Sequence, residues 1–169
     1  MSSETKHKLV IRNLREADLP ALEWDGEYRH FKRLYRQMYE QMRRGRRLML
    51  IAEFDDDIIG QAFIQFFIHR DELEKPIIPG YLHAVRVKPP FRNRGIGTQM
   101  IRIAEQVMAH KGMNCSVIAV EIDNLAALRL YERLGYERFA EDDGAWSYVD
   151  HRGERRFVSQ PAHLLKKHL

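Results

Sequence analysis

The spacing of apolar residues divides the first part of the chain into a strand and two helices. The apolar run 9–14 predicts a first strand, and Glu16 begins a short helix in which Pro20 fits only in the first turn. Apolar side chains at helical spacing then predict a second helix over 26–44 with one buried stripe. The stripe consists of Phe31, Leu34, Tyr35, Met38 and Met42.

Strand patterns follow this helix. The runs 48–54 and 58–68 flank an acidic, turn-prone tip at 55–57, which predicts an antiparallel hairpin. Two prolines in 70–80 indicate a loop, and the apolar run 81–87 predicts the next strand.

In the second half the pattern changes to helix, strand, helix. An amphipathic helix begins at about Ile96 and is ended by Gly112. The apolar run 117–120 predicts a strand covered on both faces, which the crossover helix places parallel to the preceding strand. Asn124, or Asp123 before it, caps the next helix. The C-terminal part contains short strand candidates at 146–149 and 155–158.

Length and composition indicate a single globular domain over residues 1–169. Apolar residues make up 44% of the chain and charged residues 31%, the balance of a soluble protein with a substantial core. No apolar run approaches the roughly 18 residues of a membrane span, and residues 1–8 are too polar for a signal peptide. We therefore expect a cytoplasmic protein without membrane attachment. The sequence leaves a monomer and a homodimer open.

The charge of the chain is mildly positive. Lys and Arg number 28 against 24 Asp and Glu, a formal charge of +4, which helps to attract an anionic ligand. The excess is too small and too scattered for a nucleic-acid binder, and no aromatic RNA-binding pattern is present. We expect no nucleic-acid partner.

The strongest candidate for a binding site is the turn before the helix that starts near Ile96. A helix N-terminus offers unpaired backbone N–H groups and roughly half a positive charge, which suits a phosphate or pyrophosphate. Glycine lacks a Cβ and lets phosphate oxygens approach the backbone. The turn is not a Walker loop, which needs a Lys after its second glycine, nor a dinucleotide fingerprint, which needs a third glycine where this chain has Met100. It reads Arg92-Asn93-Arg94-Gly95-Ile96-Gly97-Thr98.

With a second motif, this turn resembles the acyl-coenzyme A site of the GNAT superfamily of N-acetyltransferases. The superfamily pattern Arg/Gln-x-x-Gly-x-Gly/Ala follows a Val-x-Pro strand exit, which here is Val87-Lys88-Pro89. The pattern Asn-x-x-Ala…Leu-Tyr-x-x-x-Gly-Phe/Tyr matches 124–136. The resemblance implies an α/β (α+β) fold with a mixed, strongly twisted sheet of six or seven strands flanked by about four helices. It also implies a last strand at 163–167 and a splay between the strands 81–87 and 115–121.

The resemblance further implies direct transfer of an acetyl group from acetyl-coenzyme A, the co-substrate, to an amine. Strand backbone would pair with the pantetheine amides, the turn would hold the pyrophosphate, and an asparagine side chain would reach the coenzyme. No metal is needed, and because the His residues lack metal-ligand spacing we expect no metal site. The implied coenzyme-binding residues are Val85, Arg86, Val87, Arg92, Asn93, Arg94, Gly95, Ile96, Gly97, Thr98 and Asn124.

Two residues are candidates for proton transfer. The resemblance places Tyr131 at the Leu-Tyr position, where its phenol would protonate the departing thiolate. His83 lies where another member of the superfamily carries a histidine, and its reference pKa of about 6.5 suits a base that takes the proton of the amine. A backbone N–H of the 85–87 strand would face the thioester oxygen as it becomes negative. Alternative bases are Glu121, Glu23 and Asp25.

The acceptor pocket is expected between the first two helices and the late strands. Substrate-binding candidates there are Trp24, Asp25, Tyr28 and Trp146. Acidic and aromatic residues together suit a cationic amine, which would be a small molecule, a peptide N-terminus or a lysine. An alternative function is that of a non-catalytic member which binds an acyl-coenzyme A and regulates a partner.

Overall fold

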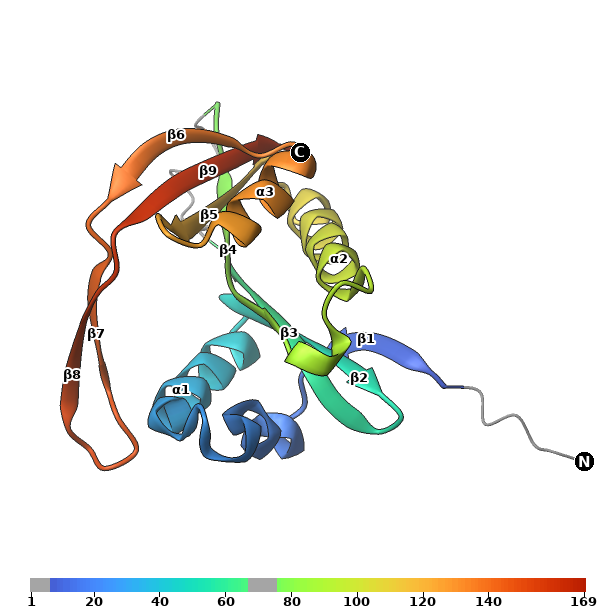
Figure 1. Ribbon diagram of the computed structural model, residues 1–169, viewed down its shortest axis with the longest axis vertical. Helices are drawn as coiled ribbons and strands as arrows, with labels where there is room; N and C mark the ends of the chain where they lie inside the picture. The colour runs from blue at the N-terminus through green and yellow to red at the C-terminus, as the bar shows by residue number, and fades with distance from the viewer. Residues whose placement is uncertain (1–6, 67–75) are drawn as a thin grey trace, which may run out of the picture.

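A mixed seven-stranded sheet forms the centre of the molecule, and a two-stranded hairpin extends from it (Figure 1). The computed structural model describes residues 7–66 and 76–169. The strand order of the sheet is β1-β2-β3-β4-β5-β9-β6, which confirms the predicted fold class. The strands are β1 (Leu9–Asn13), β2 (Arg47–Phe54), β3 (Asp57–Phe66), β4 (Pro79–Val87), β5 (Cys115–Glu121), β6 (Glu137–Asp142) and β9 (Ala162–His168), and the hairpin is β7 (Ala145–Val149) and β8 (Arg155–Ser159).

Helices cover both faces of the sheet. On one face α2 (Ile96–His110) and α3 (Leu125–Arg133) bury their apolar sides in one core with the sheet. On the other face the 3-10 segments η1 (Glu16–Gly26) and η2 (Arg29–Phe31) and the helix α1 (Lys32–Arg43) enclose a second core. No helix within the described ranges has the length and hydropathy needed to traverse a lipid bilayer.

The helical prediction for the first part of the chain is wrong in its bounds. The α-helix begins only at Lys32. Trp24, Asp25 and Gly26 have φ angles of 46°, 55° and 107°, and this left-handed backbone is followed by the non-helical Tyr28 and the 3-10 turn η2 before the α-helix starts. Pro20 lies inside η1, past its first turn, where irregular 3-10 turns replace the predicted α-helix.

Strand predictions hold better, with two differences. Strand β6 was missed because all six of its residues are exposed and show no apolar alternation. The end of the predicted strand 58–68 and most of the predicted loop 70–80 lie outside the described residues. The strand predicted at 163–167 is confirmed as β9, which inserts between β5 and β6.

The parallel strands β4 and β5 pair only at one end. Pro79 to Tyr81 lie beside Cys115 to Val117, and no pair follows, although β4 continues to Val87 and β5 to Glu121. Helix α2 closes the paired end tightly, since a Cβ on Gly80 would lie 2.3 Å from Met108 Sδ. Beyond Tyr81 the side of β4 that faces β5 therefore has no strand partner among the described residues, which confirms the predicted splay.

Candidate active site

A bulge interrupts β4 where it separates from β5. The register with β3 shifts between Gln61 and Phe63, and Ala84 adopts a φ of 52°. This left-handed conformation costs a non-glycine residue about 1 kcal/mol or more. Fully buried Gln61 donates from Nε2 to the Ala84 carbonyl at 3.2 Å. Observed backbone strain held by a buried side chain beside an opening is typical of a functional site.

After the bulge, successive side chains of β4 alternate between the two faces of the sheet. Val85 and Val87 pack against the core on the α2 side. Arg86 instead contacts Tyr28 and Tyr35, which belong to the core on the α1 side. The backbone of 85–87 thus lies between the two faces, beside the opening to β5.

The turn after β4 presents free backbone donors. Arg92 Nε donates to the Val87 carbonyl at 2.8 Å, which ties the turn to the strand end. The first backbone hydrogen bond of α2 runs from Gln99 N to the Gly95 carbonyl at 3.0 Å. Within the described ranges, the N–H groups of residues 93–98 donate to no protein acceptor. The turn therefore combines unpaired donors with the positive end of the α2 dipole.

Space is open at both glycines of this turn. A Cβ on Gly95 would meet no atom within 4 Å, and one on Gly97 would meet only Val87 Cγ2 at 3.9 Å. The φ of 77° at position 95 explains why glycine occurs there, since other residues rarely adopt this conformation. No contact with the described residues requires glycine at position 97, which leaves room for a ligand to approach the backbone closely. The turn fits a pyrophosphate.

Tyr131 is buried in the core on the α2 side, and its ring meets Tyr136 edge-on with centroids 5.4 Å apart. The Tyr136 hydroxyl is hydrogen-bonded to Ser116 at 2.8 Å and to Glu105 at 3.0 Å. The Tyr131 hydroxyl, in contrast, bonds to no residue that the structure describes. Burial raises the pKa of Tyr131 well above its usual range, so the phenol keeps its proton at neutral pH.

Asn124 caps helix α3 as predicted. Its Oδ1 accepts a hydrogen bond from the Ala127 N–H at 3.2 Å. Its Nδ2 donates to no residue of the described ranges, which leaves that amide N–H₂ available to a ligand.

His83 has an unexpected partner. Arg47, whose Nε donates to Gln41 Oε1 at 3.0 Å, places its Nη1 against His83 Nε2. Burial, and then the charge of Arg47, lower the pKa of His83 to about 3. A histidine with an occupied lone pair and so low a pKa is a poor base at neutral pH. Sequence spacing could not show this, because Arg47 is 36 residues away.

The alternative bases differ in exposure. Glu121, at the end of β5 that separates from β4, and Asp25 are exposed, whereas Glu23 is half-buried. None of the three carboxylates bonds to another residue in the part of the chain that the structure describes.

Aromatic rings connect the first segments of the chain with the hairpin. Trp24 meets Tyr28 edge-on at 5.2 Å between centroids, and Tyr28 stacks on Phe31 at 6.2 Å. Phe31 in turn contacts Trp146 at 6.1 Å and Tyr148 at 4.9 Å. The structure therefore brings together three of the four predicted acceptor residues, Trp24, Tyr28 and Trp146. It does not connect Asp25 with them through any side-chain bond.

The side chain of Arg86 was missed, since the sequence pointed only to its backbone. Its Cζ lies 3.6 Å from the Tyr28 ring centroid and 5.6 Å from the Trp24 centroid. Its Nη2 donates to the Tyr35 hydroxyl. The aromatic faces predicted to attract a cationic amine thus already face a cation of the protein. The alternation of β4 could have placed Arg86 on this face, but no local signal pairs it with Tyr28.

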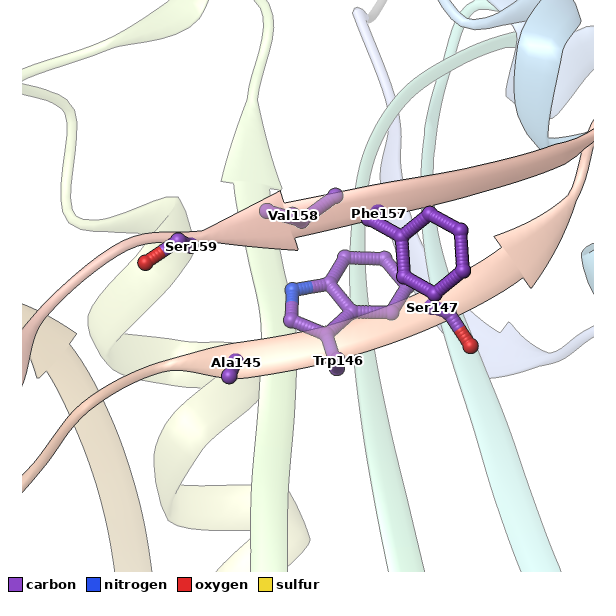
Figure 2. A pocket seen from close by; sticks show the side chains of 6 residues that line it. All are labelled: Ala145, Trp146, Ser147, Phe157, Val158 and Ser159. Carbon is purple, nitrogen blue, oxygen red and sulfur yellow. The ribbon is translucent and has the colours of Figure 1, made fainter.

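Two hollows lie beside the hairpin. One of about 460 Å³ is lined by Trp146 and Phe157, which are 41% and 82% exposed, and Figure 2 shows the Trp146 indole lying across the hairpin. The other, of about 300 Å³, lies between α1 and β7. Neither hollow is lined by residues of β4 or of the turn 92–98. The candidate site is therefore defined by the backbone of β4 and the turn that follows it. Within the described ranges no three His, Cys, Asp or Glu side chains gather to hold a metal ion.

A sheet whose two parallel strands separate beside a glycine-containing helix N-terminus is the architecture of an acyl-coenzyme A-binding acetyltransferase. The family model for the acetyltransferase (GNAT) family matches residues 11–136. The chain belongs to this family.

Named relatives and solved structures agree with the family. The chain is 30% identical to N-alpha-acetyltransferase 30 of Schizosaccharomyces pombe, over 53% of this chain and 57% of that protein. It is 32% identical to mycothiol acetyltransferase of Rhodococcus erythropolis, over 56% of this chain and 31% of that protein. The chain thus spans little more than half of the first relative and less than a third of the second. Arabidopsis thaliana NAA60 in complex with acetyl-CoA has the same fold, with a TM-score of 0.73 at 17% identity, over 96% of this chain and 99% of that one.

Proposed function

We propose that the protein transfers an acetyl group directly from acetyl-coenzyme A to a primary amine. The observation that carries this proposal is the free-donor turn 93–98 beside the opening between β4 and β5. The names of the relatives, which are acetyltransferases, and the acetyl-CoA complex of NAA60 support it.

The coenzyme-binding residues follow from these two features. The N–H groups of 93–98 would bind the pyrophosphate, with Arg92 and Arg94 adding positive charge. The backbone of Val85, Arg86 and Val87 pairs with no residue of β5 on the side that faces that strand, and there it would bind the pantetheine amides, as β5 would if the two strands stayed paired. Asn124 would donate from Nδ2 while its Oδ1 keeps the cap of α3.

Two residues of this chain would serve the transfer itself. The Val85 N–H beside the strained bulge would donate to the carbonyl oxygen as it becomes negative. Tyr131 would give its proton to the sulfur as the C–S bond breaks and the C–N bond forms. An apolar site raises the pKa of a thiol as it raises that of the phenol, so the proton remains transferable despite the burial of Tyr131.

The amine must also lose a proton. The sequence favoured His83 as the base that takes this proton, but the contact with Arg47 and the pKa of about 3 argue against this role. We propose instead that water carries the proton to Glu121, the exposed carboxylate at the diverging end of β5. Cytoplasmic location, and monomer or homodimer, stay predictions from the sequence.

A thiol-release assay tests the proposal. Acetyl-coenzyme A is presented with a panel of small amines, peptides with free N-termini and lysine peptides, and release above background with at least one class is expected. Tyr131→Phe should lower kcat about 10-fold to 100-fold while the Kd of coenzyme A stays unchanged. No release with any acceptor, together with tight coenzyme binding, would instead favour the non-catalytic acyl-coenzyme A sensor.

A further inference from the structure

Arg86 is a positive charge enclosed by aromatic rings. Its guanidinium lies over Tyr28 and near Trp24, and Lys88, two residues further along, places Nζ 5.7 Å from the same Trp24 ring. No ion pair in the described ranges includes Arg86 or Lys88. Two cations thus lie near the Trp24 ring, and no carboxylate of the described residues is bound to either.

Buried polar atoms without partners gather around this guanidinium. They include Arg86 Nε itself, Trp24 Nε1, and Oε1 of Gln61, the residue that pairs with Arg86 across β3 and β4. Two of the three are N–H donors. Buried donors without an acceptor are rare in folded proteins, and a ligand with acceptor oxygens would satisfy them.

The nearby acidic residues do not supply that acceptor. Asp150, the buried carboxylate of this region, accepts from the Arg152 and Glu154 N–H groups at 2.9 Å each and from Arg156 Nε at 2.8 Å. Glu23 and Asp25, on either side of Trp24, form no bond with a cation of the described chain. The region therefore has donors and positive charge in excess of its acceptors.

The position of Arg86 places this excess of hydrogen-bond donors and positive charge next to the expected position of the acceptor amine. The coenzyme would reach the 85–87 backbone from the side of α2, where the free turn lies. Arg86 directly follows Val85 but projects to the opposite face, between η1 and α1. An acceptor that approaches from this face would have its amine beside Val85 and its neighbouring atoms beside Arg86.

We propose that the acceptor is a small amine that carries a carboxylate close to its amino group, as an α-amino acid does. Arg86, with the Trp24 N–H, binds that carboxylate. Nη2 donates to the Tyr35 hydroxyl from one edge of the planar guanidinium, and the other edge stays available for two parallel hydrogen bonds to a carboxylate. A peptide N-terminus would place a neutral amide at the same position. This inference rests on the proposed acetyltransferase function and adds the class of its substrate.

Matched acceptors test the proposal in the intact chain. Thiol release from acetyl-coenzyme A is measured with the 20 common α-amino acids, with their amides and with the corresponding decarboxylated amines. At least one acid should have a kcat/KM about 10-fold to 100-fold above its amide and its amine. Arg86→Gln should abolish this preference. Arg36→Gln, which removes one exposed arginine of α1, should leave it intact. Acids that react no better than amides, or a preference that survives Arg86→Gln, would overturn the proposal.

A binding measurement separates this proposal from the proposed function. Calorimetry with coenzyme A present compares N-acetylated amino acids with their amides, and at least one acid should bind about tenfold more tightly than its amide. Because no turnover is required, such a preference without thiol release would refute the transferase and keep the carboxylate site. Thiol release at equal rates with acids and amides, together with equal binding of both, would instead support the transferase and refute the carboxylate site. Arg86→Lys, which keeps the charge but lacks the planar fork, provides the comparison if Arg86→Gln fails to fold.

Discussion

The side-chain amide of Gln61 donates a hydrogen bond to the Ala84 carbonyl at 3.2 Å. It thereby satisfies a backbone acceptor at the bulge of β4, where Ala84 is left-handed and the sheet register shifts. Gln61 touches none of the reacting atoms in the proposed reaction. Its position makes it a positioning residue for the adjacent Val85 N–H.

Replacing Gln61 should leave the bulge of β4, and with it the Val85 N–H, less firmly held in position for the reaction. Gln61→Met keeps the length of the side chain but leaves the Ala84 carbonyl unsatisfied, so unfolding free energy should fall by about 1–3 kcal/mol. We expect kcat to fall with it while KM for acetyl-coenzyme A changes little, since the turn 93–98 is untouched. Gln65→Met, on the same strand away from the bulge, is the control. Equal kinetics in the two variants would show that Gln61 does not position the Val85 N–H.

His83 should make stability depend on pH. Its pKa is lowered to about 3, so between that value and about 6.5 the unfolded chain binds a proton that the folded chain does not. Stability therefore rises with pH in this window, by at most about 1.4 kcal/mol per pH unit. Urea unfolding at pH 7, 6 and 5 should show a smaller loss on acidification for His83→Gln than for the wild type.

Exposed His110 provides the control for this experiment. His110→Gln should keep the wild-type pH slope. The pH dependence of kcat should also keep its shape in His83→Gln, because a histidine that is neutral above about pH 3 does not titrate in the assay range. If kcat of the wild type changes with pH near 6.5 and this change is absent in His83→Gln, His83 is the base.

The two glycines of the turn should respond differently to alanine. Gly97→Ala meets only Val87 Cγ2 at 3.9 Å, so Tm should stay the same or rise slightly, as alanine favours helix. The Kd of coenzyme A should weaken about tenfold or more because the methyl group displaces the pyrophosphate. Gly95→Ala should weaken binding and also lose about 1 kcal/mol of stability, since its φ is 77°.

Gly112→Ala separates strain from binding. Gly112 has a φ of 92° but follows the opposite end of α2, so its variant should lose stability and keep the wild-type Kd. Unchanged coenzyme affinity in Gly97→Ala would show that the pyrophosphate lies elsewhere.

Asn124 is predicted to have two separable roles. Asn124→Ala removes the cap and should cost about 1 kcal/mol of stability together with coenzyme affinity. Asn124→Ser restores a side-chain oxygen for the Ala127 N–H but lacks the amide N–H₂. Thermal unfolding and coenzyme titration should therefore show stability recovered and affinity still reduced. If serine restores both, Asn124 acts only as a cap.

Local patterns predicted the fold where the determining contacts are close in the chain. The helix from Ile96, the cap at Asn124 and the hairpin around 55–57 depend on hydrogen bonds and side-chain spacing within a few residues. The helix start and the cap were found as predicted, and the hairpin turns one residue earlier than predicted, since Asp57 already pairs with Phe54. Strand β6 escaped because an exposed strand has no apolar period. The late start of α1 was not predicted because no sequence pattern indicates three consecutive residues with left-handed backbone.

The sequence by itself determined the family motifs, the glycine-containing turn before α2 and the order of most elements, because these depend on neighbours along the chain. Only the tertiary structure decided which side chains meet. Arg47 reaches His83 across 36 residues, and Arg86 reaches Tyr35 across 51. Such contacts arise from how sheet and helices pack, and they change a charge, a lone pair or a pKa without leaving any local pattern. For this reason the proposed coenzyme site follows from sequence motifs, whereas the environment of the proposed acceptor site does not.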